Sequence, residues 1–311
     1  MSNEPPGAAP SRATGYTLLP LVVLIWGANW PLMKIGLTYI SPLWLAVGRL
    51  GLGAICLFAL LALTGRLATP TRRDLAIVVS LAVFQAALFL PLANYGLRHV
   101  PAGRSAVLAY TTPLWVVPGA VLFLGERLTA LKLGGLVSGI LGVAVLFNPL
   151  ALDWSNRDVV LGSGALMLAA MSWSVAMLHI RHHRWHLSAL QLMPWQLTLA
   201  CLLLVPPALA VDGLHGIEWN ATSIGVLLYN GTFATAFCYW AATSISRALP
   251  AITSSLSFLA VPAAGIFSSQ LVLGERPDFA LIAGFALILA GVTLVSLSDW
   301  RDASLQKYES P

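Results

Sequence analysis

The stretch from Pro101 to Leu146 reads PAGRSAVLAYTTPLWVVPGAVLFLGERLTALKLGGLVSGILGVAVL, and the chain contains a second version of it. That version, PAITSSLSFLAVPAAGIFSSQLVLGERPDFALIAGFALILAGVTLV, runs from Pro250 to Val295 at a constant offset of 149 residues. Both begin with Pro-Ala, share an internal proline (Pro113 and Pro262) and pass through Leu-Gly-Glu-Arg to a glycine-containing apolar segment. Each version predicts a helical hairpin, and a repeat of this length indicates two related halves.

The composition is that of a membrane protein. Of the 311 residues, 58% are hydrophobic and 9% are charged, with a mean hydropathy of +0.81. A soluble domain carries about 25% charged residues. The formal charge of +5 would suggest nucleic acid in a soluble protein. No basic face or motif accompanies that charge here, so we expect the lipid bilayer as a partner and no nucleic acid.

Ten apolar segments are long enough, at about 20 residues each, to span a bilayer as helices. They cover approximately residues 16–37, 43–63, 75–97, 102–123, 129–147, 158–180, 187–210, 221–243, 250–272 and 278–298. We therefore expect an all-α membrane protein with ten transmembrane helices. Residues 1–14 and 299–311 are expected to be cytoplasmic tails.

The first part of each half also repeats, at an offset of 147 residues, as the pairs Trp26–Trp173 and Ser41–Ser188 indicate. The halves cover residues 15–149 and 158–298, with five expected helices in each. Because five is odd, the second half must cross the membrane in the opposite orientation. Such inverted repeats place a substrate site near the midplane, between the halves.

Lysine and arginine predict the orientation. With the N-terminus inside, eleven of the 17 lie in inside loops and tails and five lie outside, while Arg49 is intramembrane. This bias favours cytoplasmic N- and C-termini. Glu126 would then face the cytoplasm and Glu275 the outside.

Aromatic and amide side chains recur at mid-depth in several predicted helices. Trp26 and Trp30 lie four residues apart and share a helix face. Amides in hydrocarbon are costly unless they meet a partner or a wet cavity. We expect a cavity for a small amphipathic molecule with a flat ring; core packing and interhelical hydrogen bonds are the alternatives. The expected substrate-binding residues are Trp26, Asn29, Trp30, Gln85, Phe89, Tyr110, Trp173, Met177, Asn230, Phe233, Tyr239 and Phe258.

Three further residues could control access to this cavity. Pro113 and Pro262 each remove a backbone donor at matching positions, which predicts hinges or broken helices; a static kink is the alternative. Arg49 is expected to act as a gate, pairing with Glu275 or with helix-end carbonyls at the outer rim. The three cysteines lack metal-ligand spacing, so we expect no metal and no cofactor.

Together these features resemble the drug/metabolite transporter superfamily, EamA type. The resemblance covers nearly the whole chain and rests on the two five-helix halves, Trp26-Gly27-x-Asn29-Trp30, Arg49 and the paired hairpins. Within this family the chain looks most similar to the bacterial aromatic amino-acid exporters. The resemblance implies export of amino acids or similar small metabolites by alternating access. The cavity would be formed chiefly by helices one, three, four, six, eight and nine, in a monomer or weak dimer.

Other functions are a membrane-embedded enzyme acting on lipid, a channel, or an exporter of an unrelated drug or metabolite. An enzyme would need reactive groups at membrane depth, but there is no HExxH motif, and His182, His183 and His186 lie in a basic turn expected to be solvated. A channel would need pore-lining rings. The twelve Asp and Glu residues all fall in tails, loops or helix ends. We therefore expect no obligatory proton coupling, with His179 the nearest candidate for a relay.

Overall fold

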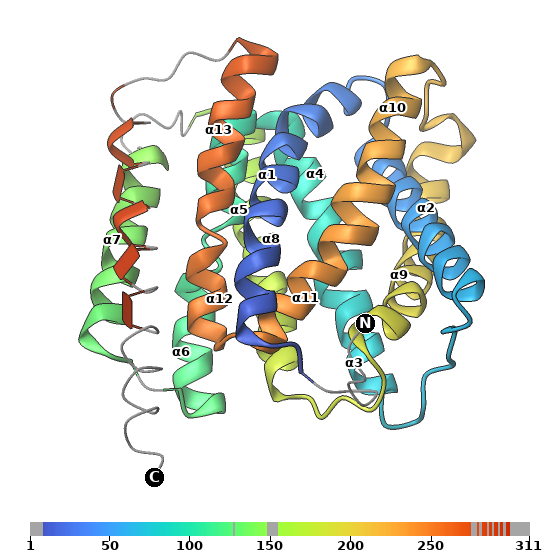
Figure 1. The fold of residues 1–311 in the computed structure, drawn as a ribbon. Helices are drawn as coiled ribbons and strands as arrows, with labels where there is room; N and C mark the ends of the chain where they lie inside the picture. Colours follow the sequence, from blue (N-terminus) through green and yellow to red (C-terminus); the bar gives the residue numbers. More distant parts are fainter. Residues whose placement is uncertain are drawn as a thin grey trace.

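The computed structural model describes residues 9–126, 128–147 and 155–274, and further along 279, 282–284, 286–287, 289–291, 293–294 and 297–298. Within these residues the regular structure is helical, apart from one isolated bridge between Ile40 and Ile217. In the part of the chain that the structure describes, seven helices are long and apolar enough to cross a membrane. The chain is therefore a multi-pass membrane protein, and its helices pack as the bundle in Figure 1.

The helices follow the apolar segments of the sequence closely. The first half contains α1 (Arg12–Gly36), α2 (Pro42–Leu63), α3 (Leu75–Ser80), π-helical η1 (Leu81–Leu88), α4 (Phe89–His99), α5 (Ala102–Ala109), α6 (Pro113–Leu124) and α7 (Ala130–Phe147). The second contains α8 (Arg157–His182), α9 (Ala189–Asp212), the short 3₁₀ turn η2 (Gly213–His215), α10 (Ala221–Tyr229), π-helical η3 (Asn230–Phe237), α11 (Cys238–Ala248), α12 (Ala251–Ser257) and α13 (Ala260–Leu273).

Elements of the two halves recur at the offset found in the sequence. The segments η1 and η3 are 149 residues apart at both ends, and so are α4 and α11. Both proline-containing helices are interrupted: α5 ends at Ala109 before α6 begins at Pro113, and α12 ends at Ser257 before α13 begins at Ala260. Pro262 lies in the first turn of α13. The predicted breaks are therefore present in both halves.

The Leu-Gly-Glu-Arg repeat has a local explanation in its glycine. Gly125 and Gly274 follow α6 and α13 with φ of 64° and 69°, the left-handed conformation that ends a helix. Several helices begin at an N-cap residue whose side-chain oxygen accepts a hydrogen bond from a backbone N–H. These caps are Ser11, Ser41, Asn156, Ser188 and Asn220. The cap at Ser11 starts α1 at Arg12, inside the segment expected to be a tail.

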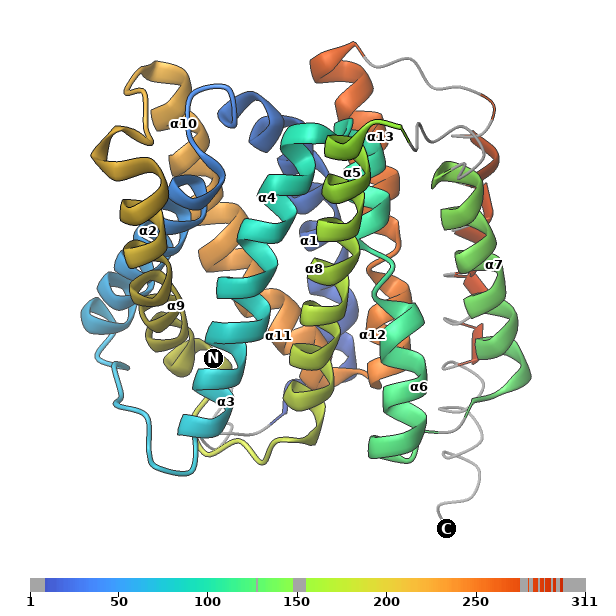
Figure 2. The same ribbon diagram turned by 180° about the vertical axis from the view of Figure 1, so that it is seen from behind.

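The halves interleave around α1 and α8. Helix α1 packs against α11 and α13, while α8 packs against α4 and α6; Figures 1 and 2 show α7 at one side of this group and α2, α9 and α10 at the other. Small residues allow the close approach: a Cβ added at Gly96 in α4 would lie 2.6 Å from the carbonyl oxygen of Gly162 in α8.

The far end of the chain is described only in part. The hydroxyl of Ser138 in α7 donates to the carbonyl oxygen of Leu287 at 2.7 Å, so α7 packs on that region. Much of the helix expected at 278–298, most of the tail at 1–14, the tail at 299–311 and Glu275 lie outside the described residues.

Candidate functional site

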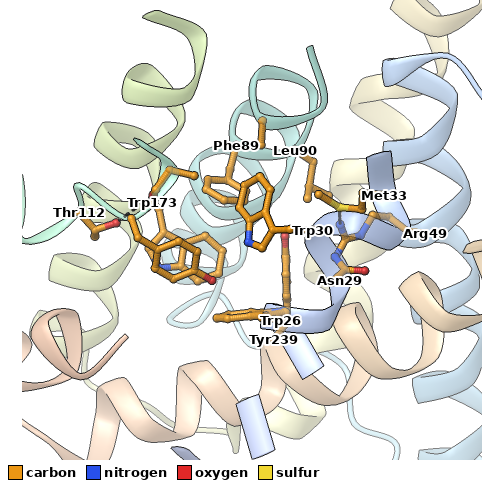
Figure 3. Close-up of a pocket in the computed structure, with 13 residues that line it drawn as sticks. Trp26, Asn29, Trp30, Met33, Arg49, Phe89, Leu90, Thr112, Trp173 and Tyr239 are labelled. Atoms are coloured by element: carbon orange, nitrogen blue, oxygen red, sulfur yellow. Dashed lines mark hydrogen bonds between the residues drawn. The ribbon is translucent and has the colours of Figure 1, made fainter. Parts of the chain in front are cut away.

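A pocket lies inside the bundle, beside the C-terminal half of α1 (Figure 3). Its cavity volume is about 40 Å³. Its lining comes from helices α1, α2, α4, α5, α8 and α11 and from the break after α5. The lining residues are Trp26, Asn29, Trp30, Met33, Arg49, Phe89, Leu90, Ala93, Ala109, Tyr110, Thr112, Trp173 and Tyr239.

One wall of the pocket is aromatic. Trp26, Trp173 and Tyr239 form a triangle with ring centroids 5.5, 6.2 and 5.6 Å apart, each pair edge to face. Phe89 lies 5.0 Å from Trp173, and Tyr110 lies 6.4 Å from Trp30. Rings at these separations attract one another beyond the burial of their area. The wall therefore offers both faces and edges to a planar ligand.

The opposite side of the pocket carries a cation. Arg49 is 2% exposed, and its Nε donates to the Thr235 hydroxyl at 2.8 Å. Its Nη2 donates to the Ala234 carbonyl oxygen at 3.3 Å, and its Nη1 approaches the Met33 sulfur at 3.2 Å. Figure 3 shows Asn29 beside this group, and its Oδ1 has no hydrogen-bond partner among the described residues. These contacts are all with neutral groups.

The two π-helical segments hold the pocket side chains through their carbonyls. The Trp26 indole donates to the Ala234 oxygen at 2.9 Å, and the Tyr239 hydroxyl donates to the Gln85 oxygen at 3.3 Å. Gln85 and Ala234 are 149 residues apart, one in η1 and one in η3. A wider turn offsets the helical hydrogen-bond ladder and makes carbonyls available to side chains. Equivalent positions in the two halves thus anchor the aromatic wall and Arg49.

Seven of the expected substrate-binding residues line the pocket. They are Trp26, Asn29, Trp30, Phe89, Tyr110, Trp173 and Tyr239. Phe258 lies behind the wall, with its ring centroid 5.9 Å from Trp26, and Met177 is buried in the same apolar core. Gln85 takes part through its backbone oxygen.

Two expected residues lie elsewhere. Asn230 is buried outside the pocket and donates to the Val226 carbonyl oxygen at 3.0 Å. Phe233 is 54% exposed and contacts Tyr229 instead. The physical reason is the π-helical turn of η3, which rotates side chains away from the directions that an α-helical count predicts.

The structure places Arg49 in the pocket wall, where its recorded acceptors are Thr235, Ala234 and Met33. Its expected partner Glu275 lies outside the described residues, and its role as a gate stays a prediction. Helical spacing could have identified Met33, four residues after Asn29, and Ala93, four after Phe89. Leu90, Ala109 and Thr112 carried no such signal.

A second polar cluster lies where α3 and α9 begin. Asp74 accepts from the Thr71 hydroxyl at 2.7 Å and the His186 backbone N–H at 3.2 Å, and His183 Nε2 lies 3.9 Å away. Burial acts to raise the pKa of Asp74, but these hydrogen bonds and His186 lower it below its ordinary value. Burial and then His179 lower the pKa of His183. The turn expected to be solvated is therefore partly packed.

Comparison with known proteins places the chain among transporters. The model of the EamA-like transporter family matches it twice, over residues 13–148 and 160–297. A probable amino-acid metabolite efflux pump of Escherichia coli is 29% identical over 94% of this chain and 98% of its own length. A probable terminal-alkyne amino-acid exporter of Streptantibioticus cattleyicolor is 27% identical, with 92% and 95% covered.

The fold is also found in a crystal structure. That protein superposes with a TM-score of 0.73 at 19% identity, covering 94% of this chain and 99% of the other. Its likeness concerns the fold alone. Taken with the two family matches, it leads to one assignment: the chain belongs to the EamA-like transporter family.

Proposed function

We propose that the protein exports amino acids, with a preference for aromatic ones, from the cytoplasm across the bacterial inner membrane. The observation that carries this proposal is the aromatic triangle of Trp26, Trp173 and Tyr239 in the same pocket as Arg49. Aromatic rings attract a planar side chain, and a guanidinium binds a carboxylate. The names of the two relatives, an amino-acid exporter and an amino-acid metabolite efflux pump, point the same way.

Loading requires the pocket to widen. A cavity needs roughly 10–15 Å³ of accessible space to hold one water, so a cavity of about 40 Å³ has room for about three waters and is too small for an aromatic amino acid. Trp30 occupies the middle of the pocket in Figure 3, and we expect its ring to move first. The breaks before Pro113 and near Pro262 would supply joints for the larger movement.

We further propose that this movement is alternating access between two inverted five-helix halves, residues 15–149 and 158–298. The elements that recur 149 residues apart support it. Single cysteines replacing Glu126 and Glu275, in a chain without native cysteines, should react with an impermeant thiol reagent from opposite sides. Equal reaction from one side would contradict the inverted arrangement and would leave amino-acid export itself standing.

Counterflow into proteoliposomes tests the transported class directly. Vesicles loaded with unlabelled phenylalanine, tyrosine, tryptophan, leucine, glutamate or lysine are offered the same labelled compound outside. We expect exchange to be fastest for the three aromatic amino acids. Equal exchange of lysine and phenylalanine would contradict aromatic preference, and absence of exchange for every amino acid would favour an unrelated metabolite.

A further inference from the structure

The pocket has charge of one sign only. Of the lining residues that the structure describes, Arg49 alone is charged; the other polar ones are neutral amides, hydroxyls and indoles. No Asp or Glu is among them. An amino acid carries one anionic and one cationic group, so this pocket can neutralise the first and not the second.

The Arg49 guanidinium can also exchange its weakest hydrogen-bond acceptor for a stronger one. An arginine has five N–H donors, and a thioether is a weak acceptor. Nη1 of Arg49 is nevertheless directed at the Met33 sulfur, 3.2 Å away on the pocket wall. A carboxylate could replace this contact with a charge-assisted, bidentate pair. An ammonium in the same place would be repelled by Arg49, since like charges repel strongly where water is scarce.

We infer that the pocket recognises aromatic monocarboxylates as a class, and that the α-amino group of an amino-acid substrate is dispensable. The inference rests on the proposed transport function and extends it to aromatic acids that have no amino group. The ring occupies the side of Trp26, Trp173 and Tyr239, and the carboxylate meets Arg49.

A second cavity, where α8 and α11 end, has matching chemistry. Its cavity volume is about 210 Å³, and its lining includes Arg181, His183, Trp185 and Arg247. The Arg247 guanidinium lies 4.4 Å from the centre of the Trp185 ring. A recess lined by basic groups concentrates anions, and the half-buried Trp185 indole offers an aromatic surface to a flat ring. Both cavities thus favour a ring that carries a negative charge.

The test compares three ligands that differ only in their charged groups: phenylalanine, 3-phenylpropionate with the carboxylate alone, and phenethylamine with the amine alone. Each competes with labelled phenylalanine in counterflow at neutral pH, against protein-free vesicles as background. We expect 3-phenylpropionate to compete within about threefold of phenylalanine, and phenethylamine to be at least about tenfold weaker. Equal competition by the amine, or none by the acid, would overturn the inference.

Labelled 3-phenylpropionate separates this inference from the proposed function. If the acid exchanges and phenylalanine does not, amino-acid export is wrong and carboxylate recognition stands. If phenylalanine exchanges and the acid neither exchanges nor competes, export stands and the inference is wrong. Exchange of neither compound contradicts both.

Variants of Arg49 locate the effect. Arg49→Gln should reduce the preference for acid over amine by about tenfold or more, because a neutral amide forms no charge-assisted pair. Arg49→Lys keeps the charge without the planar fork, so its preference should be intermediate. Arg98→Gln, which removes an exposed arginine at the end of α4, is the matched control and should leave the preference unchanged. Retention of the wild-type preference in Arg49→Gln would contradict the inference. If that variant fails to fold, the comparison of the three ligands in the unmodified protein decides the inference.

Discussion

Arg49 shows how neutral groups hold a buried cation in the part of the chain that the structure describes. Its charge is expensive to remove from water, and neutral acceptors offset only part of that cost. Thr235 and the Ala234 carbonyl fix the guanidinium from η3, a segment of the other half of the chain. The sequence identified Arg49 as the one charge that lies clearly within the membrane. Its oxygen acceptors Thr235 and Ala234 could not be predicted, because they lie 186 and 185 residues away in the chain.

Trp173 is the residue whose loss should affect ligand binding most. It contacts Trp26, Phe89 and Tyr239, so Trp173→Ala removes one side of the aromatic wall. We expect a loss of about 1 kcal/mol or more, or at least roughly fivefold in apparent affinity for phenylalanine. Counterflow at a series of concentrations measures it. Trp219→Ala, at a tryptophan that is 67% exposed, is the control, and wild-type affinity in Trp173→Ala would mean that the ring only packs the core.

The cluster around Asp74 should make stability depend on pH. The pKa of His183 is lowered in the folded chain, so the unfolded chain binds its proton more readily. Stability is therefore complete above the ordinary histidine value and decreases as the pH falls below it. Asp74, whose pKa is also lowered, adds a second loss below the ordinary carboxylate value.

Thermal unfolding in detergent between about pH 7.5 and pH 5.5 measures the histidine part. We expect the midpoint to fall with pH in the wild type and to fall less in His183→Gln. His99→Gln, at a histidine in the last turn of α4, serves as the control. An identical pH dependence in wild type and His183→Gln would contradict the assignment.

Among the elements, the two π-helical segments η1 and η3 could not be predicted from the sequence. A hydrophobic pattern shows that residues 75–97 and 221–243 span the membrane, but it does not show a turn with one extra residue. That turn moves Phe233 to the outside and presents the carbonyls of Gln85 and Ala234 to the pocket. The interrupted helices were predictable, because proline cannot donate a backbone hydrogen bond and appears at matching positions.

The turn after α6 connects the two halves through Glu126. Its carboxylate accepts hydrogen bonds from the backbone N–H groups of Ala251 and, at 3.1 Å, Ile252 at the start of α12. Glu126→Gln replaces charge-assisted bonds with weaker ones, and we expect a loss of about 1–2 kcal/mol. A lower thermal midpoint should report it, whereas Glu218→Gln, at an exposed residue, should not change the midpoint. Equal midpoints for the two variants would mean that this contact contributes nothing to stability.

For the whole molecule, composition and repeats were enough to predict a helical membrane protein, and the family was identified by the resemblance of its motifs. The apolar segments are long and almost free of charge, so alternatives with a soluble core were excluded early. Seven of the twelve expected pocket residues are in the lining, and three of them, Trp26, Asn29 and Trp30, lie in α1. The packing of α1 against α11, and of α8 against α4, joins segments that are at least 58 residues apart in the chain, and no local pattern predicts it.

Energy coupling depends on where acids lie in the whole bundle. Proton-driven carriers commonly use Asp, Glu or His inside the membrane. Here the described pocket lining contains none of these, and the described acids include Asp74, Glu126, Asp212 and Glu218, at helix ends or in loops. His179 lies in the last turn of α8, beside His183 rather than in the pocket. We therefore expect transport down the substrate gradient without obligatory proton coupling.

Net flux from loaded proteoliposomes, with no pH or sodium gradient and with the membrane potential set to zero, tests this expectation. Labelled phenylalanine should leave down its own gradient at a rate that an imposed pH gradient does not change. His179→Gln should behave like the wild type, since its ring lies outside the described pocket. Accumulation of phenylalanine against its gradient when a proton gradient is imposed would contradict the expectation. If His179→Gln then lost that accumulation, the relay would run through the histidines at the end of α8 and not through the pocket.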